Sequence, residues 1–483
     1  MNSGAPHCVA CTALNIQCTY NRPRKRRGPP NLYLQAQVQA QAQVQNENSP
    51  SSSTWITTFP PQERNNPFRL SGLGPPHVIE HIIDDWFELI YSVCPMLHHG
   101  TFTTRLSRGD ADIDLEFASV VVAVCAATIA SLRQNSDYGE ITVSKCLDEI
   151  ERIESQLGGS RRMFSLEWCQ MKYNLGVAVL TERGADDELA FRFLSESVMG
   201  VKYLIYHRMR DMSYMDQQLL KRLYWLVFAG LCTMDLHGRP SVGLLSAQDN
   251  IETLYPLSLS DENLDPIFVY SATWHGHGRS YIPGLNQLCK LFQIWHSSQQ
   301  LSLITTPSAH LAHLQAHSQR IQRALDYLPP ELQWRGGLSQ PPSANFGTQV
   351  QTANLYITQL HIRSNLLEQM NQLSKKISAM PDSAPTPSPS PVPLPTPTPV
   401  EIVQERQSIV DDMLEILYHM PDETLWANGH SLIPKIRDVG GALLDEVRTG
   451  DRPAEGNGKA KVNLERLLRK LEALDVHSRR FCM

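Results

Sequence analysis

Residues 76–90, PHVIEHIIDDWFELI, decide the fold class of this chain. Their apolar side chains, from Val78 through Ile82 to Ile90, recur at steps of three and four residues, which gathers them on one face of an α-helix. The same period returns at roughly 114–132, 142–157, 164–183, 187–209, 215–234, 284–297, 300–328, 347–379, 401–419, 431–448 and 461–475. Convincing strand alternation is absent from the sequence, so we predict an all-α protein with many helices.

Two segments of biased composition divide this helical pattern. Residues 35–75 begin with Gln-Ala-Gln-Val repeats and become rich in Ser, Pro and Asn, a composition that cannot bury a core. Residues 381–400 carry proline at nearly every second position, which predicts an extended spacer. We therefore expect a short basic segment at 1–34, a large helical domain at 76–380 and a smaller helical region at 401–483.

Charge is distributed unevenly over the 483 residues, whose net charge is −6. The first 46 residues contain no Asp or Glu and five basic residues, which leaves a net −11 for the remainder. A basic N-terminal segment followed by an acidic remainder indicates that the N-terminal segment binds a polyanionic partner. The longest apolar stretch, 118–127, is too short to cross a bilayer, and a secretory signal pattern is absent, so we expect neither a membrane span nor disulfides.

Three of the ten cysteines, Cys8, Cys11 and Cys18, are clustered with the spacing C-x2-C-x6-C. Two thiolates at C-x2-C can hold one tetrahedral zinc, and a third, six residues later, can complete a turn around it. A cationic run follows directly, formed by Arg22, Arg24, Lys25, Arg26 and Arg27. We interpret this run as a nuclear-import signal and a set of DNA-phosphate contacts. The cysteines that occur singly in helix-like surroundings read as small buried hydrophobes: Cys94, Cys125, Cys146, Cys169, Cys232 and Cys289.

The clustered segment resembles the second half of the fungal binuclear zinc cluster, in which two such halves share two zincs. Pro6 before the first cysteine and Cys18-Thr19-Tyr20 at the end both fit that half. The resemblance implies zinc as the cofactor, held by Cys8, Cys11 and Cys18, and DNA with CGG-type triplets as the partner. The first half of the cluster, with the helix that reads the triplets, does not occur in this chain. We expect a gene model that lacks an upstream exon, and no sequence-specific DNA reading by the chain as given.

A second resemblance lies in the helical body. Residues 80–106 look like the opening of the fungal transcription factor regulatory domain, and 190–208 look like one of its later helices. Residues 221–225, Lys-Arg-Leu-Tyr-Trp, followed by Gly238-Arg239-Pro240, resemble another signature of that domain. The resemblance covers roughly 78–330 and implies a nuclear, sequence-specific regulator of RNA polymerase II transcription in a fungus. It also implies contacts with the transcription machinery, a homodimer as one arrangement, and a pathway-specific role in carbon use or secondary metabolism.

Physical reasoning gives the same signature a structural role. Leu219, Leu223 and Trp225 have large apolar side chains, which we expect to pack in the core as part of a buried helix. Lys221 and Arg222 are expected on the wet side of that helix, and Gly238-Arg239-Pro240 is expected to end it in a turn. We interpret these residues as core and turn rather than as chemistry, and we expect no enzyme.

Other functions and other site types remain open at this point. Residues 84–88 and 411–415 match the aspartate-rich pattern by which helical terpene synthases hold magnesium and diphosphate, although the second metal motif of those enzymes is not found. On our interpretation these acidic residues lie on a wet helix face. An interaction-only nuclear regulator would keep the helical body without reading DNA itself. The cysteines could also form a redox pair or a single-zinc site with His7, and His275 with His277 could bind metal.

Overall fold

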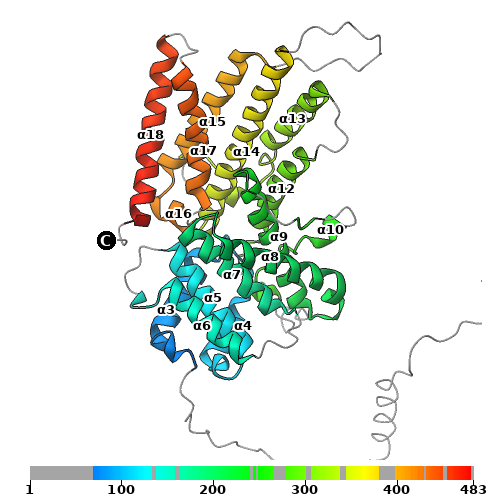
Figure 1. Ribbon diagram of the computed structural model, residues 1–483, viewed down its shortest axis with the longest axis vertical. Coiled ribbons are helices and arrows are strands. Elements are labelled where there is room, and N and C mark those ends of the chain that lie inside the picture. The colour runs from blue at the N-terminus through cyan, green and yellow to red at the C-terminus, as the bar shows by residue number, and fades with distance from the viewer. Residues whose placement is uncertain are drawn as a thin grey trace, which may run out of the picture. The chain divides into compact units, whose positions relative to one another are not determined.

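The computed structural model describes residues 69–132, 138–157, 164–239, 243–245, 249–264, 279–300, 306–337, 344–379, 397–428, 431–449 and 454–479. All of them belong to one compact unit that spans 66–483 (Figure 1). Every regular element in these ranges is helical, which confirms the prediction of an all-α fold. None of the described helices combines the length and the hydropathy needed to cross a membrane.

The principal helices have the following bounds. They are α3 (Pro76–Asp85), α4 (His99–Ser107), α5 (Leu115–Ser131), α6 (Val143–Gln156), α7 (Leu166–Arg183), α8 (Glu188–Tyr203), α9 (Tyr214–Leu236), α10 (Ile251–Leu254), α12 (Ile282–Ser298), α13 (Pro307–Gln322), α14 (Phe346–Ser378), α15 (Pro399–His419), α16 (Asp422–Ala427), α17 (Leu432–Thr449) and α18 (Ala454–Arg479). The π-helical turns η3 (Trp86–Ile90) and η6 (Leu204–Arg208) extend α3 and α8. One predicted segment, 300–328, is longer than the helix observed there, because Thr306 caps α13 and Pro307 occupies its first position.

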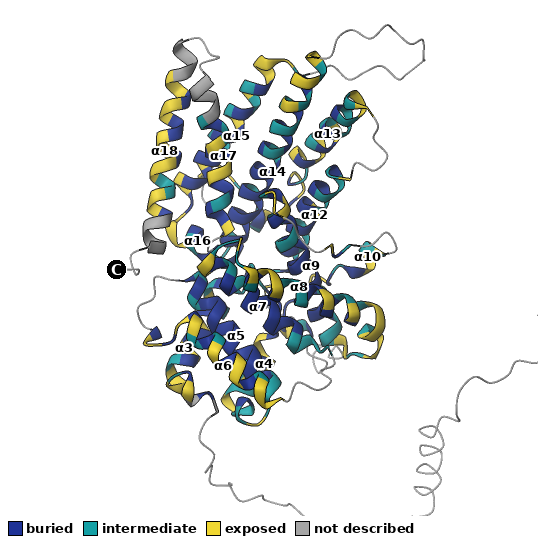
Figure 2. Ribbon diagram, in the orientation of Figure 1, coloured by how far each residue is buried: buried dark blue, intermediate teal, exposed yellow. Residues whose placement is uncertain are grey.

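Helix α5 lies at the centre of the N-terminal half of this unit. It packs against α6, α7 and α3. All residues of the apolar stretch 118–127 are buried, so α5 is covered on every side rather than on one face (Figure 2). The small side chains of that stretch, mostly Ala and Val, let the neighbouring helices approach closely.

Helix α14, with 33 residues, is the central element of the C-terminal half. Asn345 and Thr348 form a capping box that fixes its first turn. The helix packs against α12 and α13, which precede the proline-rich segment 381–400, and against α15 and α17, which follow it (Figure 1). Helices on both sides of that segment therefore share one hydrophobic core, to which Ile409 and Val439 contribute.

Helix α9 carries the signature that the sequence analysis assigned to the core and a turn. Trp225 is fully buried, stacks on Tyr255 with ring centroids 4.6 Å apart, and donates its indole N–H to the carbonyl oxygen of Leu254 over 2.9 Å. Gly238 adopts φ 67° directly after the helix, a left-handed conformation that favours glycine. The amide of Arg239 returns to the Met234 carbonyl over 2.9 Å, which confirms the predicted turn at Gly238 and Arg239. Pro240, its third residue, lies outside the described residues.

The cysteines that occur singly in helical surroundings are free thiols, as expected. Cys94 is half-buried, and Cys125, Cys146, Cys169, Cys232 and Cys289 are buried. Burial raises the pKa of the Cys94 thiol to about 12, so it remains protonated and behaves as a small apolar side chain.

The prediction for Arg222 is wrong. Lys221 is half-buried, but Arg222 has only 1% of its surface exposed and points into the core rather than into water. Its guanidinium group pairs with Asp261, itself 8% exposed, with 2.7 Å between Nη1 and Oδ1. The guanidinium also donates to the carbonyl oxygens of Pro95 and Leu259 over 3.3 and 3.2 Å. A charged residue is tolerated there because a buried carboxylate and two carbonyl oxygens replace its water shell.

Asp261 connects the same ion pair to the turn after η3. Its second carboxylate oxygen accepts hydrogen bonds from the Tyr91 hydroxyl and from the His99 amide, the latter over 2.8 Å. Its backbone carbonyl lies 2.9 Å from Nε2 of His98. Burial and the neighbouring carboxylate raise the pKa of Tyr91 well above its usual value, so its hydroxyl stays a donor. We call Arg222, Asp261, Tyr91 and His98 the Arg222–Asp261 node.

We predict that Asp261→Asn destabilises the helical unit by about 3–5 kcal/mol, because the substitution leaves a buried guanidinium without its counter-charge. Urea unfolding followed by far-UV circular dichroism measures the change. Asp186→Asn is the matched control, because Asp186 pairs with Arg239 through a side chain that is 72% exposed, and we expect that change to stay within about 0.5 kcal/mol. Equal effects of the two substitutions would show that the node contributes no more than a surface ion pair.

Candidate functional site

The residues predicted to bind zinc and DNA lie outside the described residues. These are Cys8, Cys11 and Cys18 together with Arg22, Arg24, Lys25, Arg26 and Arg27, and they stay predictions. His275 and His277 also fall outside the described ranges. The site that the structure itself presents is a cavity in the N-terminal half.

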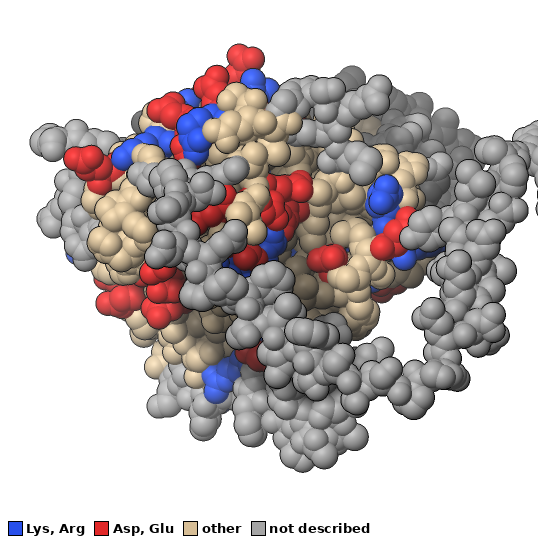
Figure 3. All heavy atoms as spheres, turned by 90° about the horizontal axis from the view of Figure 1, so that it is seen from below, with Lys and Arg blue, Asp and Glu red and all other residues tan. Residues whose placement is uncertain are grey.

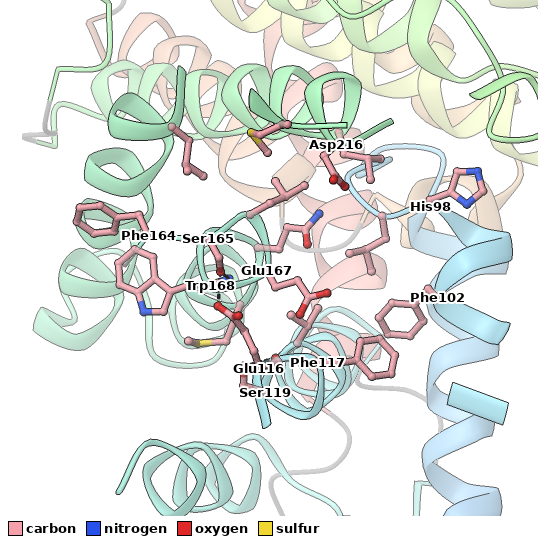
Figure 4. Close-up of a pocket in the computed structure, with 18 of the residues that line it drawn as sticks. His98, Phe102, Glu116, Phe117, Ser119, Phe164, Ser165, Glu167, Trp168 and Asp216 are labelled. Atoms are coloured by element: carbon pink, nitrogen blue, oxygen red, sulfur yellow. Dashed lines mark hydrogen bonds between the residues drawn. The ribbon is translucent and has the colours of Figure 1, made fainter. Parts of the chain in front are cut away.

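This cavity has a volume of about 750 Å³, within the range typical of small-molecule sites. It lies between α4, the first turns of α5 and α7, the π-helical turn η6 and the start of α9 (Figure 4). Asp114 caps α5 by accepting from the amides of Glu116 and Phe117, and Ser165 caps α7 by accepting from the Trp168 amide. The two caps bring the first turns of both helices, and the acidic residues on them, to the cavity wall.

Aromatic side chains form much of the apolar wall. Phe102 meets Phe117 edge to face with ring centroids 5.2 Å apart (Figure 4). On another part of the wall Phe164 contacts Trp168 at 5.1 Å and Tyr203 at 5.3 Å. Such rings offer both apolar contact and a negative face to a cation.

Arg105 is the central cation of the polar wall, but carboxylates already surround it. Its guanidinium pairs with Glu167, with Asp114 over 2.8 Å and with Asp110 over 3.7 Å, and it lies 4.0 Å above the ring of Phe117. Burial raises the pKa of the Glu167 carboxyl, and the bond from Arg105 offsets part of that shift. Arg105 is therefore bound internally and has little charge to offer a ligand.

The lining carries a net negative charge. Its acidic members are Glu116, Glu154, Glu167, Asp211 and Asp216, and its basic members are Arg105 and Arg208. Glu154 pairs with Lys172, and Arg208 lies 3.9 Å from Asp211. Glu116 and Asp216 have no ion-pair partner among the described residues; the first accepts from the Ser165 hydroxyl and the second from the Ser213 hydroxyl. The lining thus suits an apolar, aromatic ligand that carries a positive charge.

His98, the histidine of the lining, is held by bonds at both ring nitrogens. Nδ1 accepts from the Thr101 amide over 3.1 Å, so Nε2 carries the proton and donates to the Asp261 carbonyl oxygen. Neither nitrogen is free to take a proton from a substrate. The hydrogen bonds at both ring nitrogens fix the orientation of His98 in the cavity wall.

The two aspartate-rich segments do not form open carboxylate pairs. Asp84 is exposed as predicted, but the wet-face interpretation is wrong for Asp85, which is buried and accepts from the Tyr138 hydroxyl over 2.6 Å. Asp411 binds Lys459 over 2.9 Å, and Asp412 faces Arg363 over 3.4 Å. A terpene-synthase-like metal site would need these carboxylates for magnesium rather than for internal partners.

The face of the unit shown in Figure 3 carries interspersed charges. On that face acidic and basic side chains alternate among the coloured residues, and they do not gather into one basic patch. Phosphate contacts with nucleic acid need clustered Lys and Arg.

Comparison with known proteins finds one distant similarity to report. The chain is 25% identical over 267 residues to the C6 finger domain transcription factor nscR of Aspergillus fumigatus. The match covers 51% of this chain and 33% of the relative, so the chain corresponds to about a third of that protein's length. No protein-family model matches the chain, and no solved structure matches it. The relative is a transcription factor of the six-cysteine class that the N-terminal motif resembles.

We predict that the cavity prefers cationic to anionic aromatic ligands. Thioflavin T, an aromatic cation, should bind with an increase in fluorescence, and the anionic dye anilinonaphthalene sulfonate should bind more weakly. Replacing both Glu116 and Asp216 by their amides should weaken thioflavin T binding by about tenfold, a loss of about 1.4 kcal/mol. Glu80→Gln, an exposed position on α3, is the control. Stronger binding of the anion, unaffected by the double substitution, would contradict the charge assignment.

Proposed function

We propose that this chain is a transcription regulator of the fungal zinc-cluster type. In this proposal residues 1–34 contact DNA, and the helical unit carries regulation. Two features support the proposal: the C-x2-C-x6-C spacing with its basic run, and the similarity to a C6 finger transcription factor. We infer a nuclear location, RNA polymerase II genes as targets, and a pathway-specific role.

Zinc is the metal that the N-terminal segment would hold. Cys8, Cys11 and Cys18 supply three thiolates, and tetrahedral zinc takes four ligands. A two-zinc cluster of the family's kind therefore requires cysteines beyond these three, for instance Cys8, Cys11 and Cys18 of a second copy of the chain in a homodimer. The cysteines of the helical unit are poor donors for this purpose, since they are buried or half-buried within it.

We assign to the helical unit a binding role rather than a catalytic role. Its cavity has an acidic and aromatic lining, its histidine is held by the Arg222–Asp261 node, and its aspartate pairs have internal partners. A ligand-binding unit attached to a DNA-contacting segment has the organisation of a regulator. An interaction-only nuclear regulator is the second candidate, and it differs in making no sequence-specific DNA contact of its own.

We predict that the cationic run makes the phosphate contacts of this chain. Five such contacts should give salt-dependent binding to duplex DNA with a log–log slope of about −4. Changing Arg24, Lys25, Arg26 and Arg27 to Ala should reduce the magnitude of that slope by about 3 to 4. Fluorescence anisotropy on duplexes with and without paired CGG triplets, at several salt concentrations, measures both the slope and the sequence preference.

Lys459→Ala and Lys470→Ala, both on α18, form the control and should leave the slope unchanged. A preference for the CGG duplex at physiological salt favours the zinc-cluster regulator. Binding without that preference agrees with the expectation that the chain as given reads no sequence, and it leaves sequence reading to a partner. A slope that survives the fourfold substitution would contradict the assignment of DNA contact to residues 22–27.

A further inference from the structure

Two histidines and an aspartate from distant parts of the chain meet at one point of the helical unit. His237 follows the last residue of α9, His361 lies in the middle of α14, and Asp438 lies on α17. Oδ2 of Asp438 is 2.9 Å from Nδ1 of His237 and 2.9 Å from Nε2 of His361. The two imidazole rings lie with their centroids 5.3 Å apart. Three atoms that can ligate a metal, from parts of the chain far apart in sequence, therefore lie close together.

The burial of these side chains differs in a way that leaves one approach open. His361 is completely buried, and the side chain of His237 is 18% exposed. The side chain of Asp438 is 40% exposed. A small ion can therefore reach the cluster from the carboxylate side, whereas the imidazoles are held by the helix packing around them.

No Lys or Arg side chain pairs with Asp438 among the residues that the structure describes. The ion-pair partners of Asp438 among the described residues are the two histidines.

Lys435, one turn before Asp438 on α17, is directed elsewhere. Its ammonium group is directed to Asn354 Oδ1 over 3.1 Å and to Thr358 Oγ1 over 2.8 Å. Burial lowers the pKa of Lys435 to about 7, so it is a weak source of positive charge at neutral pH. The polar layer between α14 and α17 therefore holds a carboxylate that has no fixed cation beside it.

We propose that His237, His361 and Asp438 form a binding site for a divalent transition-metal ion, with zinc as the best-suited ion. Two imidazoles and one carboxylate, with one position open to solvent, are a ligand set that Zn²⁺ accepts in tetrahedral geometry. Bonds of about 2.0–2.2 Å place neighbouring ligand atoms about 3.3 Å apart. The two observed N–O separations of 2.9 Å would expand slightly, and the three ligand atoms already lie within 4.8 Å of one another. This site is separate from Cys8, Cys11 and Cys18.

The ion would join the two halves of the helical unit. Helix α9 carries Arg222 of the node, and α14 and α17 belong to the C-terminal half. A metal bound to all three stabilises the folded arrangement by mass action. The affinity should be modest, because Nε2 of His237 and Nδ1 of His361 are buried without hydrogen bonds in the described structure. Partners at such outer nitrogens contribute about 10–100-fold to metal affinity in other sites.

The test removes the thiolate ligands first, so that the proposed site is measured alone. The full chain with Cys8, Cys11 and Cys18 changed to Ser is titrated with Co²⁺, whose visible d–d bands report tetrahedral binding, and then with Zn²⁺ in competition. Asp438→Asn and His237→Gln are made in that background, since both side chains are partly exposed and the substitutions are close in size. His77→Gln, at an exposed position on α3, is the control.

The proposal expects one Co²⁺ per chain in the Ser background, displaced by Zn²⁺. It expects at least ~10-fold weaker binding after Asp438→Asn or His237→Gln, with an unchanged far-UV circular dichroism spectrum, and no change after His77→Gln. Zn²⁺ should raise the Tm of the Ser background but not that of its Asp438→Asn form. A folded Ser background that binds no Co²⁺, or binds it as well after Asp438→Asn, would overturn the proposal and leave a hydrogen-bonded triad. Because the thiolates are absent throughout, neither outcome depends on the proposed DNA-binding function.

Discussion

The ion pair between Arg222 and Asp261 is the interaction on which the N-terminal half of the helical unit depends. Burying two charges is costly, and the cost is offset only when geometry and hydrogen bonding are close to complete. Here the two terminal nitrogens of Arg222 reach Asp261 and two carbonyl oxygens, and Asp261 accepts from Tyr91 and His99. Nε of Arg222 is the one guanidinium nitrogen without a hydrogen-bond partner among the described residues. These requirements fix α9, the turn after η3 and the segment before η8 (Glu262–Leu264) relative to one another. The π-helical turn η3 serves the same end, since Tyr91 follows it directly.

The cavity is a consequence of that arrangement. His98, which lines the cavity, is oriented by its bond to the Asp261 carbonyl, and Leu219, which also lines it, lies one turn before Arg222 on α9. The caps Asp114 and Ser165 bring the acidic first turns of α5 and α7 to the opposite wall. A pocket between helices needs rigid walls, and here one wall is fixed by a buried ion pair and the other by helix capping. A ligand bound in the cavity would contact helices that share one hydrophobic core with the rest of the unit.

Helix positions could be predicted from the sequence because apolar periodicity is a local signal. The segments at 114–132 and 347–379 were assigned within a few residues for that reason. The burial of Arg222 could not be predicted, because a charged residue in a helix is normally solvated. Its partner Asp261 also lies in a segment without apolar periodicity. The meeting of His361 with Asp438 depends on tertiary packing across 77 residues. The burial of Asp85 depends on tertiary packing in the same way, because its hydrogen-bond partner Tyr138 lies 53 residues away in the sequence. The cysteine motif is a local pattern as well, and its zinc and DNA assignments remain predictions.

The central claim is that the helical unit regulates transcription rather than carrying out chemistry. The most direct measurement tethers the full chain to a heterologous DNA-binding domain and records transcription of a reporter that carries the matching site. The account predicts a change in reporter level, relative to the DNA-binding domain alone, that is lost with Asp261→Asn and retained with Asp186→Asn. A fusion protein that is nuclear and folded but leaves the reporter at the level of the DNA-binding domain alone would contradict the account.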